Sequence, residues 1–146
     1  MVFRSILVAI DGSETAWRAL EAGAELAEAL NAKLTVISVA PHVPPGAYRA
    51  GVDVATLEHE VESEVDRLLR TAVDSLPGGL PVTVLHKHGN AGEGILKQLK
   101  AGDHDLLVMG SRGRGRVATN LFGSVAAYVF FHSRVPMLVI QPQEER

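Results

Sequence analysis

The sequence predicts an α/β fold, an open five-stranded parallel sheet with helices on both faces. Two observations point to this class. Short apolar runs alternate with helical patterns along the whole chain, in the order β-α-β-α-β-α-β-α-β. The runs are apolar almost throughout, which is typical of strands buried on both faces of a parallel sheet. Right-handed crossovers between such strands place the connecting helices on both sides.

Each expected strand is a short apolar run bounded by turn-forming or helix-forming residues. Runs of this length and composition are typical of buried strands. The expected strands are residues 6–10, 33–40, 80–89, 105–109 and 135–142.

The segments between these runs carry helical patterns at residues 13–31, 54–76, 91–102 and 124–132. Apolar residues in the first recur at steps of three and four, which places them on one helix face. Asn31 and Gly102 are typical C-terminal stops. The residues expected to face the core are Ala16, Leu20, Ala24, Ala27 and Leu30 in the first helix, and Leu57, Val61, Val65, Leu68, Ala72 and Leu76 in the second.

Residues 41–53 are rich in Pro and Gly and are longer than a simple connection requires. We expect no regular structure there and interpret the segment as a mobile loop.

Composition narrows the class of protein. The 146 residues suit a single domain, residues 1–146, and 47% hydrophobic with 21% charged residues is a folded profile. No apolar run approaches the roughly 20 residues that cross a bilayer. The absence of Cys excludes disulfides and thiolate chemistry. A net charge of −3 argues against nucleic-acid and membrane partners, and we expect a cytoplasmic protein.

Residues 110–124, GSRGRGRVATNLFGS, contrast with this negative charge because they hold four Gly and three Arg. Glycine lets the backbone turn sharply and approach a ligand, and successive N–H groups in such a turn bind anions. Gly123 and Ser124 then open a helix, whose N-terminus attracts phosphate. The loop therefore predicts a phosphate cradle. It is neither a P-loop nor a dinucleotide fingerprint, because Gly-Lys-Ser/Thr is absent and no GxGxxG follows the first strand.

Two simpler interpretations stay open at this point. The glycines could only connect strand to helix, with Ser124 as a helix cap. Asp11, at the end of the first strand, could be an N-cap paired with Glu14, or could accept hydrogen bonds from a ribose or a base.

No metal site and no catalytic residue is predicted. Glu58, Glu60, Glu62 and Glu64 alternate along a helix and do not converge, so a solvated face is expected. His86 and His88 share a strand face but lack a third ligand. No base is aimed at a γ-phosphate, which fast ATP hydrolysis requires.

The glycine spacing gives the chain a family resemblance. The motif G-x2-G-x9-G-(S/T) is matched at every fixed position by Gly110, Gly113 and Gly123-Ser124. The same family has segments similar to "ILVAIDGSETAWRALEAGAELA" and "GSVAAYVFFHSRVPMLVI" of this chain. The chain resembles the universal stress protein family, in its ATP-binding branch, nearly from end to end. The match is weakest over residues 41–56 and at Ala91, where members often have Pro.

This resemblance implies a Rossmann-like fold of the adenine nucleotide alpha hydrolase kind and a pocket for ATP, with Mg²⁺ or Mn²⁺ beside the phosphates. Ala126 lacks the hydroxyl that some members offer to the phosphates. Arg112, Arg114 and Arg116 would form a cationic rim, or only a solvated basic loop. The implied contacts are Ala9, Ile10 and Asp11 at the adenosine, Val39 and Met109 at the base, and Gly110, Gly113, Gly123, Ser124 and Val125 at the phosphates.

The resemblance also implies a homodimer paired through residues 135–142, and an apolar edge strand is a separate physical reason to expect pairing. The implied function is a nucleotide-dependent stress-response regulator with little or slow ATP hydrolysis. The alternatives are an ATPase or nucleotide-transfer enzyme using the same loop, an RNA binder using the RGRGR run, and a flavodoxin-like redox module. Few aromatics flank that run, which weighs against RNA.

Overall fold

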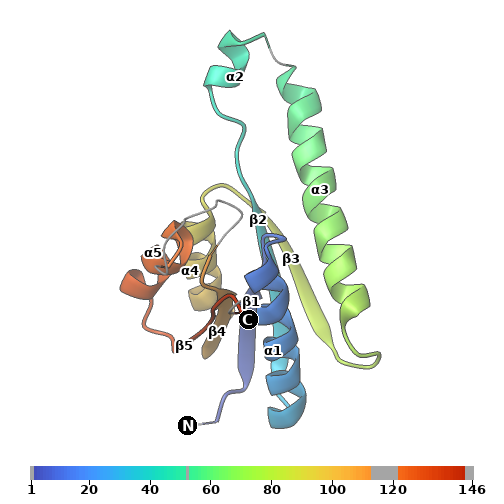
Figure 1. The fold of residues 1–146 in the computed structure, drawn as a ribbon, viewed down its shortest axis with the longest axis vertical. Helices are drawn as coiled ribbons and strands as arrows, with labels where there is room; N and C mark the ends of the chain where they lie inside the picture. The colour runs from blue at the N-terminus through green and yellow to red at the C-terminus, as the bar shows by residue number, and fades with distance from the viewer. Residues whose placement is uncertain (1, 52, 113–121, 144–146) are drawn as a thin grey trace.

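The fold is seen in a computed structural model that describes residues 2–51, 53–112 and 122–143. Within these residues the strands are β1 (Ser5–Ala9), β2 (Lys33–Ala40), β3 (Val82–His88), β4 (Leu106–Gly110) and β5 (Met137–Ile140). They form one sheet in the order β3-β2-β1-β4-β5, and every neighbouring pair is parallel (Figure 1). The predicted open parallel sheet is confirmed.

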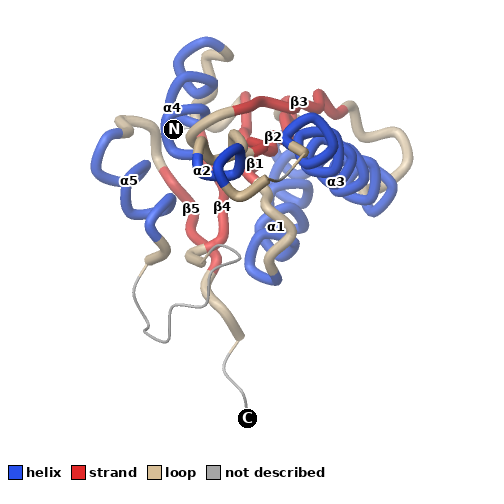
Figure 2. The backbone as a smooth tube through the Cα atoms, turned by 90° about the horizontal axis from the view of Figure 1, so that it is seen from above, coloured by secondary structure: helices blue, strands red, loops and turns tan. Residues whose placement is uncertain are grey.

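The helices cover both faces of this sheet, as predicted. They are α1 (Glu14–Leu30), α2 (Gly46–Arg49), α3 (Val54–Ser75), α4 (Ala91–Ala101) and α5 (Ser124–His132). Seen from above, α1 and α3 lie on one side of the strands, and α4 and α5 lie on the other (Figure 2).

Each face of the sheet has its own hydrophobic core. Successive strand residues point to opposite faces. Ile6 and Val8 of β1 therefore pack with α1 and α3, whereas Leu7 packs with α4 and α5. All three side chains are buried, which is why the middle of this strand is apolar on both faces.

Helix α1 begins and ends where the sequence predicts. The Ser13 hydroxyl caps its N-terminus by accepting from the Ala16 N–H, and Asn31 ends it in the left-handed conformation with φ 53°. Gly23 lets it approach β1, since a Cβ on Gly23 would lie 2.4 Å from Val8 Cγ2. The prediction that Leu30 faces the core is wrong. Leu30 is the last helical residue and is 37% exposed.

Only part of the apolar stripe of the long helix α3 is buried. Val65, Leu69 and Ala72 are buried, whereas Leu57 and Val61 are partly exposed. Figure 1 gives the reason, because the first half of α3 rises beyond the strands together with α2. Leu69 takes the buried position that the sequence assigned to Leu68, which packs at the edge of the core.

The expectation of no regular structure over residues 41–53 is wrong in one place. Gly46–Arg49 form a single helical turn, α2. The Ala47 N–H donates to the Pro44 carbonyl and the Ala50 N–H donates to the Gly46 carbonyl. Such one-turn helices are sustained by local bonds and do not need the periodic apolar face that sequence patterns detect.

His104, just before β4, links the stability of this fold to pH. It is buried, its Nδ1 lies 2.9 Å from Ser5 Oγ, and its Nε2 lies 3.1 Å from Gln98 Nε2. Burial lowers the pKa of His104, and the charges of Asp105 and Asp103 oppose this shift only in part. The folded protein therefore keeps this ring neutral at a pH where the unfolded chain takes up a proton.

We expect stability to fall as the pH drops from about 7 to about 5, because the unfolded chain binds more protons there. Replacing His104 by Gln should flatten this dependence, while replacing the exposed His59 should leave it unchanged. Urea unfolding at several pH values measures the slope of the free energy of unfolding against pH. A His104→Gln variant with the wild-type slope would contradict this account.

Candidate functional site

A cleft opens at the carboxyl ends of the strands, where β1 lies between β2 and β4. Strand order reverses at this point, which is where open α/β sheets bind ligands. The cleft has a volume of about 180 Å³ and is open on one side to solvent. A ligand that is larger than this volume would extend from the cleft into solvent.

The cleft is lined by every described residue that the sequence analysis assigned to nucleotide binding. Gly113 lies outside the described residues, as do Arg114 and Arg116. The predicted residues around the cleft are Ala9, Ile10, Asp11, Val39, Met109, Gly110, Arg112, Gly123, Ser124 and Val125.

Ala126, which the resemblance placed beside the phosphates, also lines the cleft. Other lining residues were missed, and they are Ala16, Ile37, Ala91 and Ile95. They come from the interior of a strand or from helix faces, and no glycine motif or polar side chain marks them in the sequence. Only the packing of α4 and α5 over β2 and β4 brings Ile37, Ile95 and Ala126 to one side of the cleft.

The lining of the cleft combines an apolar wall with polar groups. The apolar wall includes Ile37, Val39, Ile95 and Met109, which pack in one cluster and suit a flat aromatic base. Asp11, Arg112 and Ser124 supply the charged and hydroxyl groups of the lining. A ligand with an apolar ring and an anionic tail matches this division.

Asp11 is not the N-cap of α1, so that interpretation is wrong. Gly12 has φ 87°, and this turn moves the cap to Ser13. The Asp11 Oδ1 instead accepts from the Ser13 N–H at 2.9 Å. One carboxylate oxygen is thereby held while the residue lines the cleft.

The interpretation of Ser124 as a helix cap is also wrong. The N-cap of α5 is Gly123, and Ser124 is the first helical residue. The first intrahelical bond runs from the Ala127 N–H to the Gly123 carbonyl. The N–H groups of the first turn, beginning at Ser124, have no intrahelical acceptor, as at any helix start, and this turn lines the cleft.

Both ends of the glycine-rich loop are held by hydrogen bonds to the start of α1, to β5 and to each other. At its start, the Thr15 hydroxyl donates to the Arg112 carbonyl at 2.9 Å and the Ser13 hydroxyl donates to it at 3.3 Å. The Ser111 N–H donates to the Ile140 carbonyl of β5, and the Gly123 N–H donates to the Ser111 carbonyl. The two ends of the loop therefore lie next to each other, beside the start of α5.

Gly110 has a packing role that its spacing did not reveal. A Cβ on Gly110 would lie 2.2 Å from Thr15 Oγ1 and 2.8 Å from the Thr15 main-chain carbon. Only a residue without a side chain lets β4 approach the first turn of α1 this closely.

Three helix N-termini meet this cleft. The starts of α1, α4 and α5 contribute Ala16, Ala91 and Ser124 to its lining. Each N-terminus carries a partial positive charge that is worth about 0.3–1 kcal/mol to an exposed anion. Together they favour an anionic ligand, although the net charge of the chain is −3.

The comparisons with known proteins agree with this architecture. A profile of the universal stress protein family matches residues 3–141. The chain belongs to the universal stress protein family. Universal stress protein YxiE of Bacillus subtilis is 28% identical over 148 residues, covering 96% of this chain and 100% of that protein.

Several solved structures share the fold. The structure of hypothetical protein MJ0577 has a TM-score of 0.84 at 23% identity, over 99% of this chain and 100% of that one. A universal stress protein in complex with cAMP has a TM-score of 0.62 at 23% identity, over 97% and 98%. The Archaeoglobus fulgidus family member in complex with dAMP has a TM-score of 0.59 at 22% identity, over 96% and 99%.

Within residues 2–51, 53–112 and 122–143, no helix is both long enough and apolar enough to span a membrane.

Proposed function

We propose that this family member binds ATP in the cleft and acts in the cytoplasm as a nucleotide-dependent regulator with little or slow hydrolysis. One observation supports this most strongly. The anchored ends of the glycine-rich loop, the open first turn of α5 and an apolar wall all border one cleft. An adenine base fits the apolar wall, and a polyphosphate fits the helix N-termini.

The assignment of residues within the cleft follows from this orientation. Val39 and Met109 flank the base, with Ala9, Ile10 and Asp11 at the adenosine. Gly110, Gly123, Ser124 and Val125 border the phosphates, with Arg112 as a cationic rim. Two proteins with the same fold were solved in complex with cAMP and with dAMP. These complexes support an adenine nucleotide as the ligand of this cleft.

A divalent ion beside the phosphates fits the same lining. Mg²⁺ and Mn²⁺ prefer oxygen ligands and usually take them from phosphates, waters and one or two carboxylates. Among the described lining residues, Asp11 is the one with a carboxylate. Because Asp11 is assigned to the adenosine, phosphate oxygens and waters would supply the ligands of such an ion, and the ion would neutralise phosphate charge.

Isothermal titration of the purified chain with ATP, ADP and AMP, with and without Mg²⁺, tests this function. We expect saturable heat and a thermal shift, since ligand at a hundredfold excess over Kd adds about 2.7 kcal/mol of stability. No heat and no shift at millimolar ATP would refute it. Multiple-turnover phosphate release that Asp11→Ala abolishes would instead assign an ATPase.

Thr15 provides a test of loop anchoring. Thr15→Val removes the donor to the Arg112 carbonyl, and we expect ATP affinity to fall roughly threefold to tenfold, the value of one hydrogen bond. Thr15→Ser keeps the donor and should bind like the wild type. If the two variants bind ATP with equal affinity in the same titration, the hydrogen bond from Thr15 to the Arg112 carbonyl does not contribute to ATP binding.

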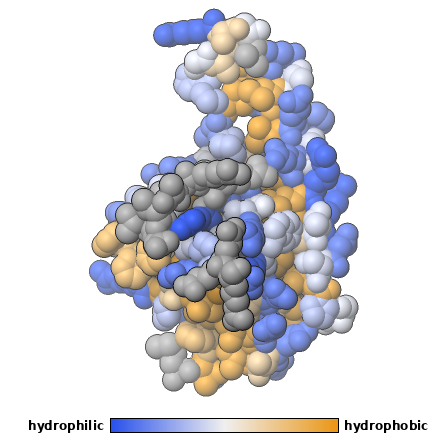
Figure 3. Space-filling view, in the orientation of Figure 1, coloured by the Kyte–Doolittle hydropathy of each residue, from blue (hydrophilic) through white to orange (hydrophobic). Residues whose placement is uncertain are grey.

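We propose that the protein is a homodimer paired through β5. Within the described residues β5 is an edge of the sheet, and Leu138 on it is 37% exposed. Phe130 and Phe131 of neighbouring α5 are exposed as well, and apolar surface lies over α5 at the left of Figure 3. An exposed apolar edge of this kind is normally covered or paired.

Leu138→Lys is expected to shift the protein from dimer to monomer, because a charge would be buried at the strand interface. Val84→Lys is the matched control, since Val84 is 39% exposed on the opposite edge strand, β3. Light scattering at micromolar concentrations gives the mass of each. A Leu138→Lys variant of unchanged mass rules out pairing through β5.

A further inference from the structure

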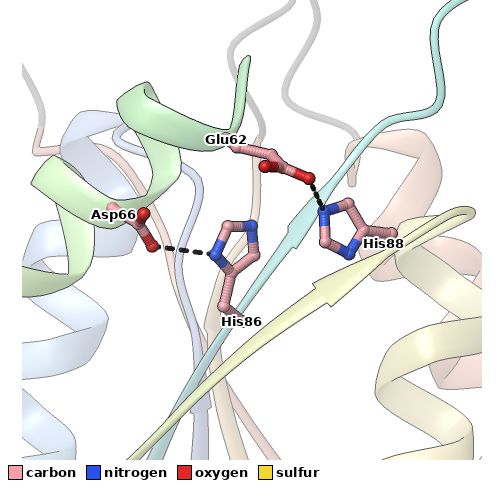
Figure 4. Close-up of polar contacts among 4 residues, drawn as sticks. All are labelled: Glu62, Asp66, His86 and His88. Atoms are coloured by element: carbon pink, nitrogen blue, oxygen red, sulfur yellow. Dashed lines mark hydrogen bonds and ion pairs between the residues drawn. The ribbon is translucent and has the colours of Figure 1, made fainter. Parts of the chain in front are cut away.

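A cluster of histidines and carboxylates joins α3 to β3, away from the cleft (Figure 4). His86 Nδ1 lies 2.9 Å from Asp66 Oδ1, and His88 Nε2 lies 3.0 Å from Glu62 Oε1. The two imidazole rings stack with centroids 4.9 Å apart. Glu62 is exposed, as the predicted solvated face requires, but it also contacts His88, which the sequence did not indicate.

The geometry of the chain explains why these side chains meet. His86 and His88 are two apart on a strand and share a face. Glu62 and Asp66 are four apart on a helix and share a side. Because α3 packs over this face of β3, one carboxylate comes opposite each ring.

The second nitrogen of His86 has no hydrogen-bond partner among the described residues. Its Nε2 is buried and makes no hydrogen bond that the described residues can account for. An ionised carboxylate only accepts, so Asp66 holds the proton on Nδ1 and leaves Nε2 of the neutral ring with a free lone pair. In Figure 4 this nitrogen turns toward the side where Glu62 and His88 lie.

We propose that His86, His88 and Glu62 bind one divalent transition-metal ion of the Zn²⁺ type. Zinc binds imidazole nitrogen and carboxylate oxygen at about 2.0–2.2 Å, so two ligand atoms in tetrahedral geometry lie about 3.3 Å apart. The 3.0 Å separation of His88 Nε2 and Glu62 Oε1 is close to this value. The metal takes the place of the proton between these two atoms, and the neutral ring of His88 then carries its proton on Nδ1.

Asp66 acts as a positioning residue in this site. Metal-binding histidines commonly donate their other ring N–H to a carboxylate, which fixes the tautomer and the ring orientation. The bond from His86 Nδ1 to Asp66 has this form and directs the free Nε2 away from Asp66.

The ion would draw the ligands together by side-chain rotation. Among the described residues, no group of three His, Asp or Glu side chains can hold a metal ion in its present arrangement, so the site forms only when the side chains move. The side chains of His88 and Glu62 are 46% and 52% exposed and so have room to move. A cavity of about 230 Å³ beside them, also lined by His42 and Glu58, leaves space for water or a fourth ligand.

Titration of the full chain with Zn²⁺ alone, without nucleotide, tests this site. We expect one equivalent bound with a micromolar Kd, and a Co²⁺ complex with the visible absorbance of a tetrahedral site. His88→Ala and Glu62→Gln should each weaken zinc binding at least about tenfold, and Asp66→Asn by about tenfold to a hundredfold. Mg²⁺ should not compete, because it prefers all-oxygen sites.

His59→Ala and Glu60→Gln are the matched controls, since both residues are exposed on α3. They should bind zinc like the wild type, and circular dichroism shows whether each variant is folded. Absence of saturable binding, or unchanged binding by a folded His86→Ala/His88→Ala variant, overturns the proposal and leaves two ion pairs that join α3 to β3. The ATP proposal is untouched by that result, because the titration contains no nucleotide.

Discussion

Gly123→Val is expected to abolish ATP binding while the protein still unfolds cooperatively. Gly123 is buried, lines the cleft, and is the N-cap of the helix whose first turn faces the phosphates. A branched side chain at this position occupies space that the phosphates need and disturbs the bond from the Gly123 N–H to the Ser111 carbonyl. We expect affinity to fall at least about a hundredfold, which corresponds to about 2.7 kcal/mol.

The matched control is Gly78→Val. A Cβ on Gly78 meets nothing within 4 Å, and the residue follows α3 far from the cleft lining. This variant should bind ATP like the wild type. Isothermal titration gives both affinities and urea unfolding gives both stabilities. If Gly123→Val binds ATP with wild-type affinity, the phosphates do not lie at the start of α5.

Gly110→Ala is expected to destabilise the fold strongly. The added methyl would lie 2.2 Å from Thr15 Oγ1 and 2.8 Å from the Thr15 main-chain carbon, so α1 must move away from β4. Overpacking commonly costs 1–3 kcal/mol, and a clash with main chain belongs at the upper end. We expect a loss of about 3 kcal/mol, or a Tm lower by about 10 °C.

Gly46→Ala is the control for Gly110→Ala. A Cβ there meets nothing within 4 Å, so the stability should change by less than about 1 kcal/mol. Thermal and urea unfolding measure both variants. A Gly110→Ala protein as stable as Gly46→Ala would show that α1 tolerates displacement from β4, and the packing role of Gly110 would be wrong.

The two glycine variants separate two roles within one motif. Gly110 and Gly123 belong to the same spacing pattern, and the sequence assigned both to the phosphates. The structure gives Gly110 a packing reason of its own, at the contact between β4 and α1. Loss of stability in one variant and loss of affinity in the other would establish that difference in solution.

The amino-acid sequence by itself determined the succession of elements along the chain. Apolar runs, helical spacing and stop residues such as Asn31 placed every strand and all helices except α2. These features depend on residues that are close neighbours in the chain, so local patterns are sufficient to detect them. The glycine spacing likewise located the loop, because its conformation needs glycine at given positions.

Tertiary structure alone decided which distant segments meet. The order β3-β2-β1-β4-β5 brings the turn after β1 beside the loop after β4, so Thr15 reaches the Arg112 carbonyl, 97 residues away. The packing of α3 on β3 places Glu62 against His88, 26 residues on. Neither contact leaves a periodic signal, because each depends on how whole elements cross and pack. The shape of the cleft and the histidine cluster therefore follow from packing between elements, whereas the elements themselves follow from local sequence.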